Sequence, residues 1–228
     1  IGMVVPVAYS VSNDQRVILQ FSTYGEMQEA AAAYNISDPK KWEERLRVIP
    51  TASLIRADLR KMYEADYSFY YNFADDDLSF MYRRLGYRLM VCRDTFVYHA
   101  AGTAMTEEDF AFDLEAGREL FQRKYFGVDA WDDAHFDPML RDSCLAVVPE
   151  REVHRILGID VRCGADLLHF KNGFRALGIE QVTLSAFVQD AKYWVDLQTI
   201  CDGEVFCLPQ RDFAAALQGH TYDYIILG

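Results

Sequence analysis

The chain has 228 residues, of which 51% are hydrophobic, and a formal net charge of −12 at pH 7. This hydrophobic content is enough for a packed core and excludes a globally disordered chain. The excess of acidic residues excludes an extended nucleic-acid surface, which needs clustered Lys and Arg. No uninterrupted apolar run reaches the roughly 18 residues of a transmembrane helix.

The cysteines and the N-terminus bear on the compartment. Five cysteines, an odd number without a Cys-x-x-Cys pair, predict reduced thiols in a cytoplasmic protein rather than disulfides or a zinc site. We find no signal peptide with a basic start and an apolar core. Because the chain opens on Ile1, directly at an apolar strand, we expect it to be an excised piece of a longer protein.

The first half of the chain shows strand and helix patterns in turn. An apolar run predicts a buried strand over 1–9. The later expected elements are a helix at 25–34, a short helix after 37–39 that carries Trp42, a strand at 48–56, helices at 58–65 and 75–85, strands at 88–92 and 95–99 joined by a turn at 93–94, and a helix from 106 to about 125. Thr106 is the expected N-cap of the last helix, with Asp109 three residues on.

A more regular alternation begins near residue 144. Strands are expected at 154–159, 181–186, 204–208 and 222–227, with helices at 165–177, 191–200 and 212–218. Parallel strands need a crossover, usually a helix, so this alternation predicts parallel βαβ units. The polar and aromatic stretch ahead of it predicts a linker or lid. We therefore expect an α/β protein with one domain over 1–130, a linker over 131–149 and a second domain over 150–228.

Acidic, basic and imidazole side chains gather within about 25 residues of the first domain. Three acids at 75–77 open a predicted helix, Arg83 and Arg84 close it, and His99 ends the next strand. Carboxylates and an imidazole brought together can hold a divalent metal ion or take a proton from a hydroxyl. Arginines can bind phosphate. The structural alternatives are a solvated helix cap, a solvated helix face and a core histidine bonded to backbone.

The order of these segments over residues 1–130 resembles the acceptor-side half of the family 2 glycosyltransferases. In that family, a Glu-Asp-x-Asp-Leu-Ser segment, an Arg-rich Gly-Tyr turn and a strand ending in Val-x-His follow one another. The corresponding segments here are Ala74-Asp75-Asp76-Asp77-Leu78-Ser79, Arg83-Arg84-Leu85-Gly86-Tyr87 and Phe96-Val97-Tyr98-His99. Weaker matches are Val4-Val5-Pro6, the loop 12–15, the segments 39–46 and 54–58, and a helix end at 121–127 that is similar to Phe-x-x-Lys-Trp-Gly.

This resemblance implies a GT-A type fold and inverting sugar transfer from a nucleotide-sugar to a hydroxyl of a glycan or other acceptor. By position, Asp75 is implied to be the base that takes the proton from that hydroxyl. Asp77 would orient the loop or the acceptor. His99 is implied to help hold Mg²⁺ or Mn²⁺, or the diphosphate itself. Arg83 and Arg84 are candidates for binding the phosphates of the donor. The acceptor would allow peripheral association with a membrane, as in bacterial polysaccharide synthesis.

The chain departs from the family pattern in three places. Ala74 stands at the position of the family's glutamate, and Met81 stands where an arginine is usual. The half with the Asp-x-Asp metal motif does not match any part of the chain, so we expect a complete donor site only in the parent protein, and activity of this chain alone stays open. Just before the acids, Tyr67, Tyr70 and Tyr71 are candidates for stacking on a sugar or for core packing.

Residues 150–228 resemble the start of a Rossmann-like methyltransferase domain, in which a Leu-Glu-x-Gly-Cys-Gly-x-Gly segment lets the backbone approach S-adenosylmethionine. Gly158 stands here where the acid belongs, and only Gly164 of the glycine set is present. The segment 184–187 also lacks the acid expected after the second strand. We therefore expect a degenerate and truncated α/β module that does not bind S-adenosylmethionine.

Two other functions stay open at the level of sequence. Ala74, Met81 and the altered glycine loop favour a non-catalytic interaction or scaffold piece derived from a transferase. The third reading is an S-adenosylmethionine-dependent methyltransferase. Nucleotide binding that requires a metal ion would favour the glycosyltransferase.

Overall fold

The computed structural model describes residues 1–62, 66, 68–69, 72–100, 106–131, 142 and 145–228. The chain divides into two compact units, residues 1–124 and 125–228. Each unit contains one four-stranded sheet, so the α/β class expected from the sequence is confirmed. The segment predicted as a linker or lid lies largely outside the described residues.

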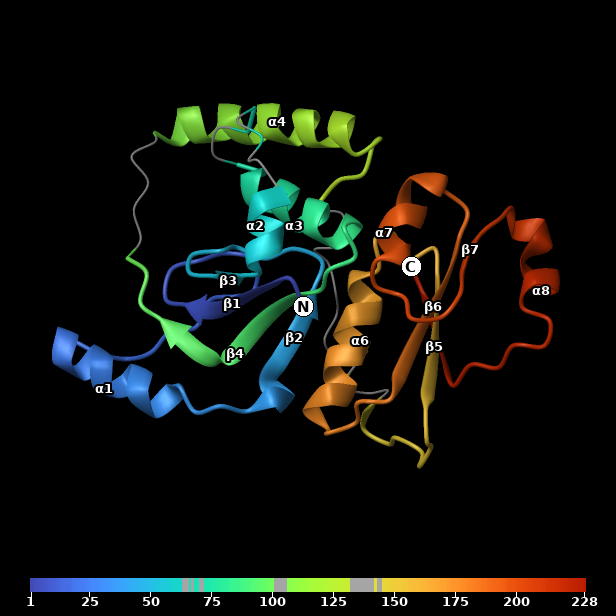
Figure 1. Ribbon diagram of the computed structural model, residues 1–228, viewed down its shortest axis with the longest axis horizontal. Helices are drawn as coiled ribbons and strands as arrows, with labels where there is room; N and C mark the ends of the chain where they lie inside the picture. The colour runs from blue at the N-terminus through green and yellow to red at the C-terminus, as the bar shows by residue number, and fades with distance from the viewer. Residues whose placement is uncertain (63–65, 67, 70–71, 101–105, 132–141, 143–144) are drawn as a thin grey trace. The chain divides into compact units, whose positions relative to one another are not determined.

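Unit 1 is built on a mixed sheet (Figure 1). Its strands are β1 (Met3–Ala8), β2 (Trp42–Arg45), β3 (Leu54–Ile55) and β4 (Leu89–Val97). They lie in the order β2-β4-β1-β3, with β1 parallel to β4 and the two edge strands antiparallel to their neighbours. The apolar side chains of β1 and β4 form the centre of the core, because both strands are buried in the middle of the sheet.

The helices of unit 1 lie close to their predicted positions. They are α1 (Tyr24–Tyr34), α2 (Ala57–Met62), α3 (Ala74–Arg84) and α4 (Glu107–Lys124). The expected N-cap of α4 is confirmed, since the Thr106 hydroxyl accepts the backbone N–H of Asp109 at 3.1 Å. Gly86 follows α3 with a φ of +87°, the left-handed conformation that ends a helix most easily at glycine. In Figure 1, α2 and α3 lie over one side of the sheet, and α1 extends from another part of it.

The turn predicted at Arg93 and Asp94 is wrong, because β4 runs through it as one strand with a bulge. Pro6 of β1 pairs with Cys92, whereas the next residue pairs with Phe96. The extra residues bulge out of the ladder. The bulge turns the Asp94 carboxylate into the protein, where it is 3% exposed and accepts hydrogen bonds from other segments.

Trp42 was predicted on a short helix and lies instead at the start of β2. A single 3-10 turn, Pro39–Lys41, precedes it. The Trp42 Nε1–H donates to Asp94 at 2.8 Å, which fixes the indole beside the bulge. The strand predicted over 48–56 is also much shorter, because side chains rather than a neighbouring strand bind the backbone of its first half. Only Leu54–Ile55 pairs in the sheet.

An aromatic cluster joins α4 to α3. The Phe121 ring packs against Phe80 edge to face at 4.9 Å and against Phe73 at 5.6 Å between ring centroids. Gly117 allows close approach, since a Cβ there would lie 3.1 Å from the Asn72 carbonyl oxygen. The cluster fixes α4 over the start of α3, where the three acids lie.

Unit 2 has the parallel sheet that its alternating pattern predicted. Its strands are β5 (His154–Ile159), β6 (Val182–Val188), β7 (Val205–Cys207) and β8 (Tyr224–Leu227). All pairs are parallel, in the order β7-β6-β5-β8. The helices are α6 (Ala165–Ala176), α7 (Trp194–Gln198), which continues a 3-10 turn, and α8 (Phe213–Ala216). In Figure 1, α6 and α8 lie on opposite sides of the strands.

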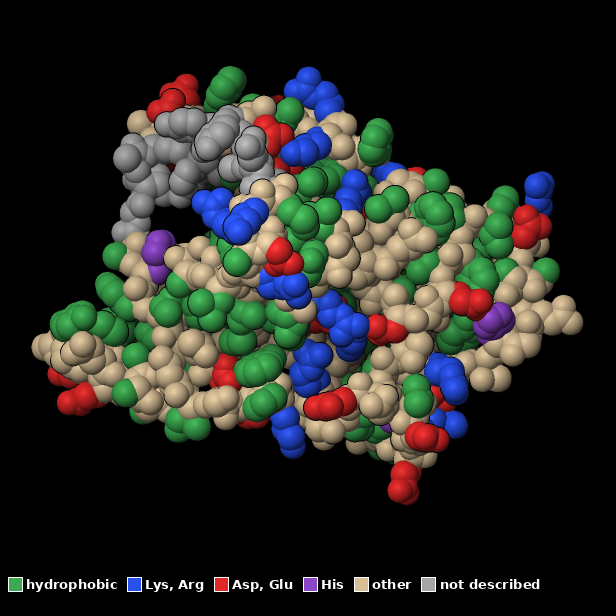
Figure 2. Space-filling view, in the orientation of Figure 1, with side chains coloured by type: hydrophobic (Ala, Val, Ile, Leu, Met, Phe, Trp, Pro, Cys, Tyr) green, Lys and Arg blue, Asp and Glu red, His purple; other side chains and the backbone are tan. Residues whose placement is uncertain are grey.

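The surface carries both signs of charge. Figure 2 shows basic side chains interspersed with acidic and uncharged ones on one face of the molecule. None of the helices in the described part of the chain combines the length and hydrophobicity needed to cross a bilayer.

Candidate active site

Unit 1 contains a cavity of about 370 Å³ beside the start of α3. Its apolar walls come from Pro50, Ile55, Phe69, Ala74, Leu78 and Tyr82, and its polar groups from Ser53, Arg60, Asp66 and Asp75. This volume is at the lower end of the range of small-molecule sites, roughly 300–1,000 Å³. Few polar groups on mainly apolar walls are also typical of such sites.

Asp75 is the sequence-predicted site residue that lines this cavity. It lies in the first turn of α3 and is partly buried, unlike the buried Asp76 and Asp77 beside it. Burial, and then the charge of the adjacent Asp76, raises the pKa of Asp75 from 3.8 to about 6. Because pH 7 is above this value, Asp75 is mainly a carboxylate there. Its conjugate acid has a pKa close to neutrality, which suits a general base.

Asp77 does not line the cavity and lies in a buried ion pair. Its side chain is 1% exposed, and its Oδ1 is 2.8 Å from the Lys124 Nζ. The same ammonium group is 2.8 Å from Asp66 Oδ2 at the cavity wall. Hydrogen bonds from Lys124 and Ser68 lower the pKa of Asp66 to about 2, so Asp66 is a carboxylate at neutral pH. Lys124 thus links the end of α4 to the start of α3 and to the cavity.

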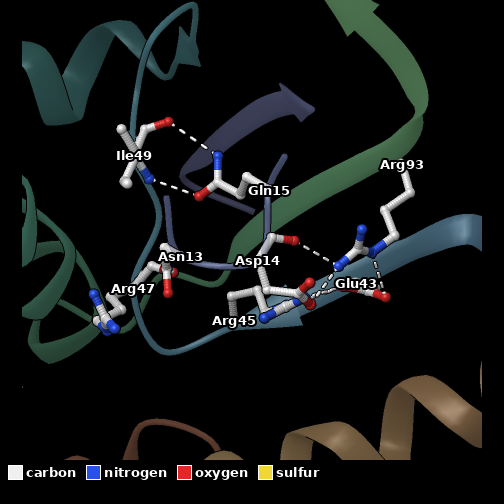
Figure 3. Close-up of polar contacts among 8 residues, drawn as sticks. All are labelled: Asn13, Asp14, Gln15, Glu43, Arg45, Arg47, Ile49 and Arg93. Carbon is white, nitrogen blue, oxygen red and sulfur yellow. Dashed lines mark hydrogen bonds and ion pairs between the residues drawn. The ribbon is translucent and has the colours of Figure 1, made fainter. Parts of the chain in front are cut away.

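Side chains of the loop at 12–15 bind the backbone of residues 47–49, the segment that precedes Pro50 of the cavity wall (Figure 3). The fully buried Gln15 binds Ile49 twice, accepting its N–H at 2.7 Å and donating to its carbonyl at 3.1 Å. Asn13 donates to the Arg47 carbonyl at 2.9 Å. The Arg47 guanidinium in turn lies 3.2 Å from Asp76 Oδ1. These contacts fix the backbone just before Pro50, and Arg47 forms an ion pair with the acid next to Asp75.

A cluster of charges holds the same loop to the sheet. Asp14 Oδ2 is 2.6 Å from the Arg93 guanidinium and 2.9 Å from that of Arg45. Glu43 bonds to the Arg93 Nε at 2.7 Å. Asp14 has a φ of +53°, a conformation that Asp and Asn tolerate better than other non-glycine residues. The loop is therefore fixed by β2 and β4 together.

The structure places neither predicted phosphate ligand, Arg83 or Arg84, on the cavity wall. Arg83 is 2% exposed, and its Nε donates to the Leu46 carbonyl at 2.8 Å. Its guanidinium lies 4.4 Å from the centre of the Phe80 ring. This burial argues for a packing role. Arg84, at the end of α3, is half-buried. Phosphate binding by these two residues stays a prediction.

His99 is exposed and lies just beyond β4 rather than at the cavity. Its Nδ1 is 2.9 Å from the Ser10 carbonyl oxygen. Since a carbonyl can only accept, Nδ1 carries the proton, and a neutral ring then leaves Nε2 as an acceptor. Among the described residues, no three His, Cys, Asp or Glu side chains come together in a group that could hold a metal ion. The His, Cys, Asp and Glu side chains of the described residues therefore do not form a metal centre. Metal binding by His99 stays a prediction.

The structure also brings in residues that sequence reasoning missed. Arg60 and Asp66 line the cavity, and Lys124, 47 residues beyond Asp77 in the sequence, pairs with both Asp66 and Asp77. Neither motif nor spacing marks Arg60, which is one of several charged residues on α2, or Asp66, which follows that helix. Lys124 falls in the helix-end segment noted above, but nothing in the sequence indicates its partners. The predicted sugar-stacking residues at 67, 70 and 71 lie outside the described residues, whereas Phe69 and Tyr82 supply aromatic walls.

In unit 2, the glycines expected to approach a cofactor are covered by the unit's own side chains. A Cβ on Gly158 would lie 2.6 Å from Val161 Cγ2. A Cβ on Gly164, which has a φ of +90°, would clash with Ile200 Cδ1. Asp160 bonds through both carboxylate oxygens to Gln189, at 2.9 and 2.7 Å. Internal packing therefore accounts for these glycines.

Comparison of the chain with protein-family models, curated proteins and solved structures gives no match. The function therefore has to be argued from the geometry of the site.

Proposed function

We propose that unit 1 is the acceptor side of an inverting glycosyltransferase of GT-A type, with Asp75 as the catalytic base. The observation that carries this proposal is the position of Asp75 on a small, mainly apolar cavity, with a pKa raised to about 6. A partly buried carboxylate with a near-neutral pKa can take a proton that an exposed Asp, with its lower pKa, takes poorly. The order of sequence segments supplies the reaction class.

In the proposed reaction, the hydroxyl oxygen of the acceptor attacks the anomeric carbon of a nucleotide-sugar. The new carbon–oxygen bond forms as the bond from that carbon to the diphosphate breaks, which inverts the configuration. The hydroxyl proton passes to the Asp75 carboxylate, and the nucleoside diphosphate leaves with the bonding electron pair.

Asp77 has a supporting role in this proposal. Its ion pair with Lys124 fixes the first turn of α3, on which Asp75 is held. Lys124 also holds the Asp66 carboxylate at the cavity wall, where it can accept hydrogen bonds from acceptor hydroxyls. The donor half of the reaction and any divalent cation are not assigned to residues of this chain.

A transfer assay tests the proposal. The chain is incubated with UDP-glucose, UDP-N-acetylglucosamine, GDP-mannose and dTDP-rhamnose in turn, with a mixture of methyl glycosides, and release of nucleoside diphosphate is measured. We expect Asp75→Asn to reduce the rate by about 100-fold or more, the usual contribution of a general base. Glu29→Gln, which removes one exposed acid on α1, is the control and should keep the wild-type rate. Measurable transfer by the wild type with an equal rate in Asp75→Asn would refute the role of Asp75, and no transfer by the wild type would refute a transferase activity of this chain.

For unit 2, we infer a Rossmann-like scaffold module without a bound cofactor. The strand order β7-β6-β5-β8 supports the Rossmann-like scaffold. Numbered within the unit it is 3-2-1-4, the order of the first four strands of a doubly wound sheet. The packing of Val161 against Gly158 and of Ile200 against Gly164 supports the lack of a bound cofactor. Calorimetric titration with S-adenosylmethionine should give no saturable heat, and saturable binding would favour a methyltransferase instead.

A further inference from the structure

The cavity beside Asp75 contains a cation whose charge has no acidic partner in the described part of the chain. Arg60 lies on α2 and lines the cavity. Nearby cations are already paired: Arg56 lies 2.7 Å from Asp58, and Lys124 bonds to Asp66. For the Arg60 guanidinium, the described residues offer no hydrogen bond or ion pair.

Arg60 and Asp75 act on different parts of the cavity. Burial and the charge of Asp76 set the pKa of Asp75, without a contribution from Arg60. The charge of Arg60 acts instead on Tyr82. Burial raises the pKa of the Tyr82 hydroxyl, and the positive charge of Arg60 partly opposes this rise. The two charged groups therefore form no ion pair with each other, although both line the same cavity.

Apolar side chains lie beside Arg60, which is itself exposed. Pro50, Ile55, Phe69 and Leu78 present apolar surface to the same cavity. A guanidinium also binds carboxylate and phosphate through two parallel N–H···O bonds, which favours these groups over neutral ones.

We propose that the acceptor is a sugar that carries an anionic substituent, a carboxylate or a phosphate, which binds Arg60 while a hydroxyl of the same sugar faces Asp75. This inference rests on the proposed function and names the substrate class of the same cavity. The net charge of −12 makes general attraction of anions unfavourable. A preference for an anionic sugar would therefore have to come from a local cation.

Binding of three matched probes tests this proposal. Glucose, glucuronate and glucose 6-phosphate are titrated into the chain, and their dissociation constants are measured by NMR. We expect at least one anionic sugar to bind about tenfold or more tightly than glucose, the usual gain from a charged hydrogen-bonded pair. A preference for glucuronate assigns the carboxylate, and a preference for glucose 6-phosphate assigns the phosphate.

Variants at two neighbouring positions separate a local contact from a general effect of charge. Arg60→Gln should reduce binding of the preferred anionic sugar to the level of glucose, and Arg60→Lys should keep part of the preference. Lys61→Gln is the matched control, because it removes one positive charge from an exposed residue of the same helix that does not line the cavity. Lys61→Gln should leave the preference unchanged.

Two results would overturn the inference: equal binding of all three sugars by the wild type, or equal losses in Arg60→Gln and Lys61→Gln. Failure of the proposed function would be recognised separately. Full transfer activity of Asp75→Asn would refute the base, whereas loss of transfer in that variant without an Arg60-dependent preference would refute only the anionic acceptor.

Discussion

Replacement of Asp75 by Asn should stabilise the protein at high pH. In the folded state, burial and Asp76 raise the pKa of Asp75 from 3.8 to about 6, so the carboxyl resists ionisation. Above pH 6 the folded state carries a partly buried charge that the unfolded state solvates freely. A pKa difference of about 2 between the two states corresponds to about 3 kcal/mol, because one unit is about 1.4 kcal/mol. The neutral amide of Asn avoids this cost.

The sign of the effect follows from linkage. A folded-state pKa raised above the unfolded value means that the stability contributed by Asp75 is fully present below pH 3.8 and is lost as pH rises to about 6. The wild type should therefore lose about 3 kcal/mol from this residue between low pH and pH 8. Asp75→Asn should be more stable than wild type by about 2–3 kcal/mol at pH 8 and by less than about 1 kcal/mol at pH 4.

Urea unfolding of wild type and Asp75→Asn at the two pH values measures this difference. Because the chain has two units, amide hydrogen exchange in β1 and β4 reports unit 1 specifically. Glu29→Gln should show no pH-dependent gain. The reasoning is refuted if Asp75→Asn is no more stable than wild type at pH 8, or if its advantage is the same at pH 4.

Three further outcomes are expected. In the transfer assay, kcat/KM should rise with pH and level off above an apparent pKa near 6, the value for Asp75, and a profile flat from pH 5 to 8 would contradict this. Lys124→Met should cost about 1–3 kcal/mol in urea unfolding, because it removes the ammonium group that pairs with the buried Asp77 carboxylate, whereas no measurable cost would argue against the pair. Gly164→Ala should destabilise unit 2 by about 1–3 kcal/mol, since its φ is +90° and its Cβ would contact Ile200, and unchanged exchange in β5 would refute this.

Much of the secondary structure could be predicted from local sequence. The apolar run at the start predicted β1, and alternation in the second half predicted a parallel sheet, because side-chain periodicity and short connections are local properties. The N-cap at Thr106 followed from the spacing to Asp109. The helix that carries Asp75 was also expected within one residue at each end.

Other elements depended on contacts between distant segments. The bulge in β4 needs the register with Pro6 of β1, and Trp42 lies in β2 because Asp94 of that bulge binds its indole. The strand expected over 48–56 is short because the side chain of Gln15 occupies the backbone groups of Ile49. Local propensity carries no information about these partners.

The sequence by itself singled out Asp75 as a candidate base, through a segment of acids at the start of a helix. Only the tertiary structure separated it from its neighbours: Asp75 lines a cavity, Asp76 pairs with Arg47, and Asp77 pairs with Lys124. The three consecutive residues have the same side chain, but successive positions on a helix point in different directions, so each carboxyl reaches a different environment. Which of them keeps a near-neutral pKa is decided by burial and by the charges that folding brings near it.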